Sequence, residues 1–136
     1  MSVPASPQDV VESLMRGISD GQWSELDQLF AEDAVIDYPF ALPAPVRLDG
    51  IGAIRRYFAT TATFPMKLRA RNLVVHTTAD PDVVIAEWDY DGVATSTGRV
   101  FRVSNITVST IREGKIVASR DYHNHAVLAD VIGRTS

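Results

Sequence analysis

The order of its predicted elements places this chain in the α+β class, with helices packed on one face of a curved sheet. Three segments with helical periodicity lie in the first half, and about four to five alternating strand segments are predicted in total, most of them after Pro65. Helices that precede the strands, instead of alternating with them, are typical of α+β domains with antiparallel sheets. The 136 residues, 46% of them hydrophobic, suffice for one core, so we expect one domain over 1–136 with loose ends at 1–5 and 133–136.

The helices are predicted from their caps and their apolar spacing. Ser6 can cap the first helix, Pro7 suits its first position, and Gly21 ends it. A second, short helix is predicted over 22–33 and a third over 51–62. The apolar faces that support these helices contain Val10, Leu14 and Ile18, then Trp23, Leu26, Leu29 and Phe30, and finally Ile51, Ile54, Tyr57 and Phe58.

The strands are predicted from alternation and from turn residues between the runs. Residues 34–38 form a short strand, and the prolines at 39, 43 and 45 exclude regular structure from the loop that follows. Four longer strand segments are expected within 67–79, 81–92, 98–114 and 115–125. The stretches "ADPDV", "GVATSTG" and "REGK" are typical of the links between antiparallel strands.

Composition narrows the classes of function. The net charge of −4 and the absence of a basic stripe argue against a nucleic-acid partner. Without cysteine, disulfides, thiolate nucleophiles and cysteine-ligated metals are excluded. No apolar run approaches the roughly 20 residues that cross a membrane, and the first residues lack the pattern of a signal peptide. We therefore expect a cytoplasmic protein with no nucleic-acid or membrane partner.

The last predicted strand ends in the titratable cluster "SRDYHNH". Alternation places Asp121 and His123 on one face, so a carboxylate and an imidazole lie close enough to share a substrate group or a water. We take these two as the candidate catalytic residues. The alternative is an ion pair of Asp121 with Arg120 at the surface and a histidine at a rim. A metal site built from His123, His125 and His76 has weak support from this spacing, and we expect no metal.

Seven further residues are candidates for substrate binding, since they offer flat rings or polar groups to a ligand. Trp88 and Tyr90 share one face of a strand, although plain core packing explains them equally well. Asn105 interrupts an otherwise alternating strand, where an amide faces either solvent or a ligand. The full set comprises Tyr38, Phe40, Tyr57, Phe58, Trp88, Tyr90 and Asn105.

The segments "LFAEDAVIDYP", "GAIRRYF" and "GKIVASRDYHN", in this order, resemble the SnoaL-like branch of the nuclear-transport-factor-2-like superfamily. The resemblance covers about residues 8–132. It implies a cone-shaped α+β fold, with three N-terminal helices on a strongly curved, mixed or antiparallel sheet that encloses a pocket. It also implies a homodimer formed through the outer face of the sheet and chemistry without a cofactor.

Residue by residue, the resemblance carries over Asp121. It matches an aspartate on the last strand of limonene epoxide hydrolase, and an aspartate late in the SnoaL polyketide cyclases. Tyr38 stands where ketosteroid isomerase has its catalytic base, with Asp37 one residue earlier, and Arg102 stands where PhzA/PhzB proteins have a glutamate. The sequence therefore resembles the family in fold while keeping one of its known catalytic groups.

Three functions are compatible with these observations. The first is an enzyme of the isomerase, cyclase, lyase or epoxide-hydrolase kind, with cofactor-free acid–base chemistry on a hydrophobic cyclic or polyketide-like molecule. The second is a non-catalytic binding module for a small apolar ligand. The third is a dimerisation domain that makes no use of its pocket. We favour the first, with Asp121 as acid and base and His123 as its partner.

Overall fold

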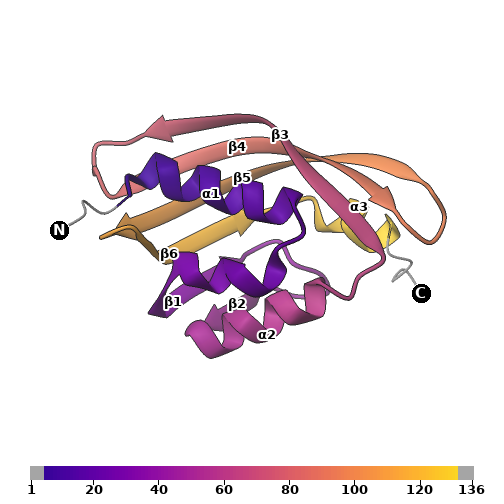
Figure 1. The fold of residues 1–136 in the computed structure, drawn as a ribbon, viewed down its shortest axis with the longest axis horizontal. Coiled ribbons are helices and arrows are strands. Elements are labelled where there is room, and N and C mark those ends of the chain that lie inside the picture. Colours follow the sequence, from indigo (N-terminus) through magenta and orange to yellow (C-terminus); the bar gives the residue numbers. More distant parts are fainter. Residues whose placement is uncertain (1–4, 132–136) are drawn as a thin grey trace.

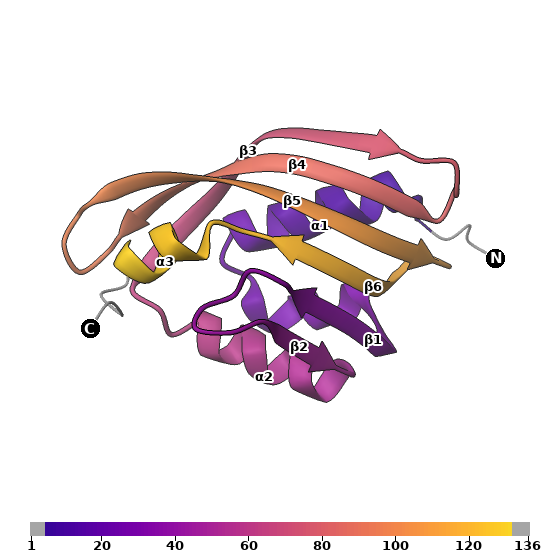
Figure 2. The same cartoon turned by 180° about the vertical axis from the view of Figure 1, so that it is seen from behind.

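The computed structural model describes residues 5–131, in which a six-stranded mixed sheet carries helices on one of its faces (Figures 1 and 2). The strands are β1 (Phe30–Tyr38), β2 (Val46–Asp49), β3 (Met66–Thr77), β4 (Val83–Ala94), β5 (Val100–Arg112) and β6 (Lys115–Tyr122). The helices are α1 (Pro7–Ser19), the 3₁₀ helix η1 (Trp23–Leu29), α2 (Ile51–Thr61) and α3 (His125–Val131). The α+β class predicted from the sequence is confirmed.

The strand order across the sheet is β2-β1-β6-β5-β4-β3, and the sheet is open, with β2 and β3 at its edges. β1 runs parallel to β6, and all other neighbouring strands are antiparallel. The long strands β3, β4 and β5 bend over the helices (Figure 1). A bulge in β3 between Arg71 and Val74, where Asn72 has a φ of 58°, marks one point at which the pairing register shifts.

Two expectations about the number of elements were wrong. Six strands are present instead of four to five, and α3 adds a fourth helix to the three in the N-terminal half. β2 was missed because Pro39, Pro43 and Pro45 obscured the short run after them, which pairs with β1 in antiparallel register. The predicted second helix was too long, since β1 already begins at Phe30.

α1 begins and ends as the sequence predicted. The Ser6 hydroxyl oxygen accepts a hydrogen bond from the backbone N–H of Asp9 at 3.1 Å, and Pro7 occupies the first turn. The helix ends at Ser19, and Gly21 follows with a φ of 70°, which glycine adopts without strain. Among the described helices, none combines the length and the apolar character that a membrane span requires.

The helices cover the inner face of the sheet and leave the opposite face open. α1 packs on β3, β4 and β5, whereas α2 packs on β1 and β2 (Figures 1 and 2). Along β4 the exposure alternates, so that Val84, Ala86, Trp88 and Tyr90 are buried under the helices. The aromatic and polar side chains of the inner face therefore lie between the sheet and the helices.

Candidate functional site

A cavity of about 760 Å³ lies between the inner face of the sheet and the helices. Aliphatic and aromatic side chains from α1, α2 and β1 make up most of its wall, and polar side chains gather where β4, β5 and β6 lie side by side. Among the described residues that line it there is no lysine or arginine, and Asp121 is the one acidic residue. The polar members of the lining are Trp23, Tyr38, Tyr57, Thr61, Trp88, Tyr90, Thr107, Ser109, Ser119, Asp121, His123 and His125.

Asp121 and His123 lie next to each other on the cavity wall. Asp121 lies at the end of β6 and His123 directly follows the strand, and both side chains line the inner cavity. Asp121 Oδ2 is 3.8 Å from His123 Nε2, and the two side chains are 17% and 13% exposed. Asp121 Oδ1 accepts a hydrogen bond from the hydroxyl of Ser119, which is buried two residues earlier on the same face. Arg120 is exposed, and none of the ion pairs found among the described residues joins it to Asp121.

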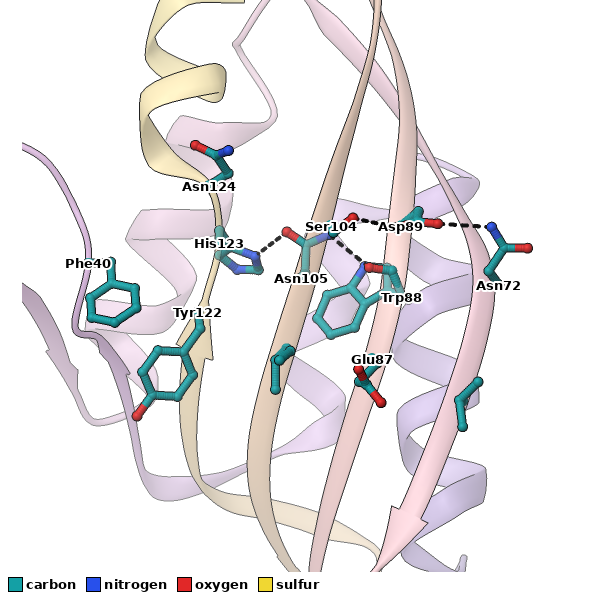
Figure 3. A pocket seen from close by; sticks show the side chains of 12 residues that line it. Phe40, Asn72, Glu87, Trp88, Asp89, Ser104, Asn105, Tyr122, His123 and Asn124 are labelled. Atoms are coloured by element: carbon teal, nitrogen blue, oxygen red, sulfur yellow. Dashed lines mark hydrogen bonds between the residues drawn. The ribbon is translucent and has the colours of Figure 1, made fainter.

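The imidazole of His123 also contacts β5 on its other side. Its Nδ1 lies 2.8 Å from the amide oxygen of Asn105 (Figure 3). Asn105 is buried, with 3% of its surface exposed, and does not line the 760 Å³ cavity. The amide therefore meets the candidate site through His123 and not directly.

Aromatic rings surround His123. The ring centroid of Tyr38 is 5.9 Å away, that of Trp88 6.0 Å and that of Tyr90 6.5 Å. Burial, and then the negative charge of Asp121, raise the pKa of both Tyr38 and Tyr90 above the ordinary value of a phenol. Both hydroxyls therefore stay protonated and can donate hydrogen bonds to a ligand at any working pH.

Two nitrogens of this region are buried without a partner in good geometry among the described residues. They are Nε1 of Trp88 and Nε2 of His125. Burial and the neighbouring His123 lower the pKa of His125, whose ring centroid is 5.6 Å from that of His123. The neutral imidazole of His125 thus offers an unused nitrogen beside the cavity, whereas the indole of Trp88 lies close enough to the Tyr90 hydroxyl to offset part of the rise in the pKa of that phenol.

The remaining predicted site residues divide between the two faces of the sheet. Tyr57 and Phe58 from α2 line the cavity, and the Tyr57 ring stacks on Tyr38 at 5.1 Å. Phe40 lies outside it, 64% exposed, with its ring 5.2 Å from that of Tyr122 (Figure 3). Phe40 and Asn105 border a shallower hollow of about 510 Å³ on the outer face, and Trp88 and His123 border both this hollow and the cavity.

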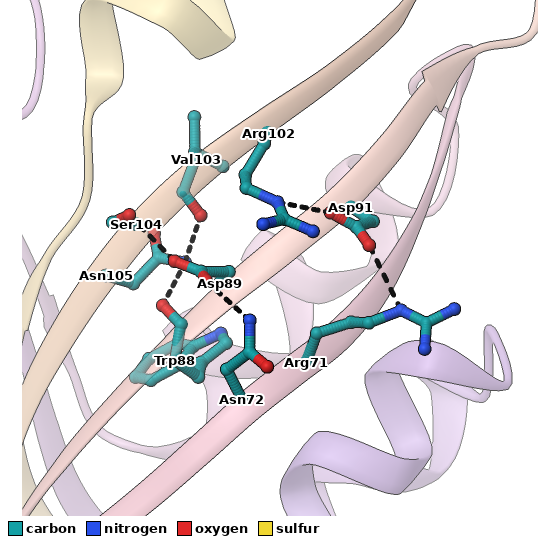
Figure 4. Close-up of polar contacts among 9 residues, drawn as sticks. All are labelled: Arg71, Asn72, Trp88, Asp89, Asp91, Arg102, Val103, Ser104 and Asn105. Atoms are coloured by element: carbon teal, nitrogen blue, oxygen red, sulfur yellow. Dashed lines mark hydrogen bonds and ion pairs between the residues drawn. The ribbon is translucent and has the colours of Figure 1, made fainter.

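Three acidic residues, Glu87, Asp89 and Asp91, alternate along β4 and lie on the outer face of the sheet. Their carboxylates contact polar side chains of the neighbouring strands β3 and β5, as Figure 4 shows for Asp89 and Asp91. Asp91 accepts from Arg102 Nε at 2.7 Å and pairs with Arg71 Nε at 3.0 Å. The hydrogen bond from Arg102 lowers the pKa of Asp91, and the hydrogen bond from Asn72 lowers the pKa of Asp89. These carboxylates are engaged on the surface and do not reach the cavity.

The outer face also contains His76, the third histidine considered as a metal ligand. Its Nε2 lies 2.6 Å from Glu87, away from the cavity that His123 and His125 line. Among residues 5–131, no group of three or more His, Asp and Glu side chains is arranged to hold a metal ion.

Several polar residues of the cavity were not predicted from the sequence, among them Thr107 and Ser119. Thr107 pairs with Asp121 across β5 and β6, so its position depends on a register that the sequence does not reveal. Ser119 could have been found, because it lies two residues before Asp121 on the same strand and hence on the same face.

The chain is thus an α+β domain, in which an open mixed sheet carries helices on one face and Asp121 and His123 lie in the cavity between sheet and helices. The family model described as "SnoaL-like domain" matches residues 11–119, and the chain belongs to this family. The chain is 35% identical over 115 residues to "Uncharacterized protein YesE" of Bacillus subtilis. The aligned region covers 82% of this chain and 74% of that protein.

Solved structures share this fold, among them the following two. The crystal structure of a "Putative Isomerase from Bacillus subtilis" has a TM-score of 0.85 and 30% identity, over 93% of this chain and 91% of that one. A "putative polyketide cyclase" from Xanthomonas campestris has a TM-score of 0.76 and 19% identity, over 92% and 95% of the two chains. At 19% identity the second comparison concerns the fold alone. The resemblance seen in the sequence is thereby confirmed.

Proposed function

We propose that this protein is a small-molecule enzyme that performs cofactor-free acid–base chemistry in the 760 Å³ cavity. The observation that carries the proposal is the contact of Asp121 and His123, 3.8 Å apart on a largely apolar wall. A carboxylate and an imidazole at this distance can remove a proton from one atom of a bound molecule and return it to another. Isomerisation, cyclisation, dehydration and hydration all require such a transfer.

The cavity lining supports a hydrophobic, uncharged substrate. No lysine or arginine among its described residues could neutralise a carboxylate or a phosphate, and a buried anion beside Asp121 is unfavourable. The rings of Tyr38, Trp88 and Tyr90 offer flat surfaces to a cyclic or polyketide-like molecule. Their hydroxyl and indole hydrogens suit an oxygen acceptor such as a carbonyl. The name of the structural neighbour at 30% identity, a "Putative Isomerase", agrees with this chemistry.

The roles of the residues follow from their positions. Asp121 is the acid and base, His123 is its partner, and the hydroxyl of Ser119 orients Asp121. Tyr38 and Tyr90 hold the substrate as neutral donors, because their raised pKa values keep them protonated. Phe40 and Asn105, which lie outside the lining, do not touch the substrate in this proposal.

The test is turnover and binding by Asp121→Asn, with a panel of cyclic ketones, lactones and epoxides. The variant keeps the shape of the side chain but cannot act as a base, so we expect turnover to fall by about 10²–10⁴-fold while binding persists. Asp37→Asn, which removes a carboxylate that pairs with Arg47 outside the cavity, is the matched control and should leave turnover unchanged.

A non-catalytic binding module is the second candidate, favoured by the observation that Asp121 is the one acidic residue in the described lining. In that case ligands of the panel bind with unchanged affinity to Asp121→Asn and leave chemically intact from the wild-type protein. Turnover retained in Asp121→Asn would contradict the assignment of Asp121 as the acid and base.

A further inference from the structure

The buried amide of Asn105 on β5 has different partners at its two ends. Its Nδ2 donates to the backbone oxygens of Val103 at 3.3 Å and Trp88 at 3.5 Å (Figure 4). Both carbonyl oxygens can only accept hydrogen bonds. The NH₂ group of the Asn105 side chain must therefore point toward them, which determines the orientation of the amide. Its Oδ1 therefore faces Nδ1 of His123, 2.8 Å away (Figure 3).

The orientation of this amide determines where the neutral imidazole of His123 carries its hydrogen. An amide oxygen only accepts, so Nδ1 must be the donor and must hold the hydrogen. In a neutral ring Nε2 then has a free lone pair. Nε2 is the nitrogen that lies 3.8 Å from Oδ2 of Asp121, which lines the cavity.

We propose that Asn105 is the positioning residue of the site: by holding the Nδ1 hydrogen of His123, it makes Nε2 the atom that gains and loses protons beside Asp121. This inference rests on the acid–base role proposed above for His123. Asn105 acts through His123 and does not touch the substrate.

The opposite tautomer is disfavoured by the surroundings. It would turn the lone pair of Nδ1 toward the lone pairs of the Asn105 oxygen, with no hydrogen between them. His123 is 13% exposed and Asn105 is 3% exposed. Water therefore has little access to this contact and cannot readily replace the lost hydrogen-bond partner. Buried polar groups without a partner are rare for this reason.

An amide suits this role better than a carboxylate. It selects the tautomer without adding a second negative charge beside Asp121. When Nε2 accepts a proton from a substrate, the ring becomes an imidazolium, and its Nδ1–H stays hydrogen-bonded to the amide oxygen of Asn105. The Nε2–H can then return to the product or pass to Asp121, after which the ring is neutral in its original tautomer.

The test is a long-range ¹H–¹⁵N correlation spectrum of the full, uniformly labelled chain at alkaline pH, without ligand. We expect His123 to show a protonated Nδ1 and an unprotonated Nε2. Asn105→Leu has a similar size but offers no hydrogen-bond acceptor. In this variant most of the neutral His123 rings should adopt the Nε2–H tautomer, which a histidine side chain prefers in water. Asn105→Asp restores an acceptor and should restore the Nδ1–H form.

The other two histidines serve as internal references, assigned with His76→Gln and His125→Gln, and Asn105→Leu should leave the His76 pattern unchanged. An Nε2–H tautomer in the wild type would overturn the proposal, even if no Asn105 variant folds. An unchanged His123 pattern in a folded Asn105→Leu would overturn it equally. Because no substrate is present, this result is independent of the turnover experiment that tests the proposed function.

Discussion

At the scale of single residues, the site is built from neutral hydrogen-bonding groups around one carboxylate. Tyr38 and Tyr90 keep their hydrogens because burial and Asp121 raise their pKa values. His125 keeps its lone pair because burial and His123 lower its pKa. These neutral donors and acceptors surround Asp121 and His123, the two groups to which we assign proton transfer.

The lowered pKa of His125 predicts a pH dependence of folding stability. The unfolded chain, with a histidine pKa of about 6.5, binds more protons than the folded one between that value and the lowered pKa. Stability from neutral His125 is therefore complete above about pH 6.5 and is lost as the pH falls through this window.

This dependence is measured by urea unfolding at several pH values between about 5 and 8. His125→Gln should lose less stability on acidification than the wild type, because glutamine does not titrate. Ala126→Gln, an exposed neighbour on α3, is the control and should follow the wild-type curve. Parallel curves for His125→Gln and the wild type would contradict the assignment.

At the scale of elements, α2 is held to the sheet by a buried apolar stripe. Ile54 is 0% exposed and Phe58 7%, and the Phe58 ring lies 5.7 Å from that of Phe30 on β1. We expect Ile54→Ala to lower the free energy of unfolding by about 2–5 kcal/mol, because the truncation leaves a cavity in packed surroundings. The measurement is urea unfolding followed by circular dichroism.

Arg56→Ala changes an exposed position of the same helix and should alter the free energy of unfolding by less than about 0.5 kcal/mol. If both variants unfold at the same urea concentration, α2 is not anchored through Ile54.

Much of the candidate site could be predicted at this scale, because strand alternation is written in the sequence. From this alternation the sequence predicts that Trp88 and Tyr90 share one face of β4. It likewise predicts that Asp121, at the end of β6, and His123, directly after it, point to the same side. The meeting of Asn105 with His123 could not be predicted, since it depends on how β5 is paired with β6. Phe40 follows a strand that ends before it, so alternation no longer determined where its ring points.

At the scale of the whole molecule, the uncovered face of the sheet is the surface that the expected homodimer would use. The hollow of about 510 Å³ on this face is bordered by exposed apolar side chains, with Phe40 64%, Val74 50% and Ile106 42% exposed. We propose that a second copy covers them, since apolar side chains gathered in this way are typical of interaction surfaces.

Light scattering after gel filtration tests this proposal. We expect about twice the chain mass of 14.9 kDa for the wild type, and a shift toward the monomer for Ile106→Lys, which introduces a charge into the hollow. Ser24→Lys, exposed on η1 at the helical side, should keep the wild-type mass. A monomeric wild type at tens of micromolar protein would contradict a homodimer.

If this protein acts as proposed, an uncharged ring compound binds in the cavity beside Asp121 and His123, and ligand titration followed by NMR measures that binding at single residues. The indole N–H signal of Trp23, which lines this cavity and not the outer hollow, reports on the inner side, and the methyl groups of Val74 report on the outer face. We predict that cyclic ketones move the Trp23 indole signal together with the His123 ring signals while the Val74 methyls stay in place. Shifts confined to Val74 and its neighbours, or an absence of shifts across the panel, would contradict the account.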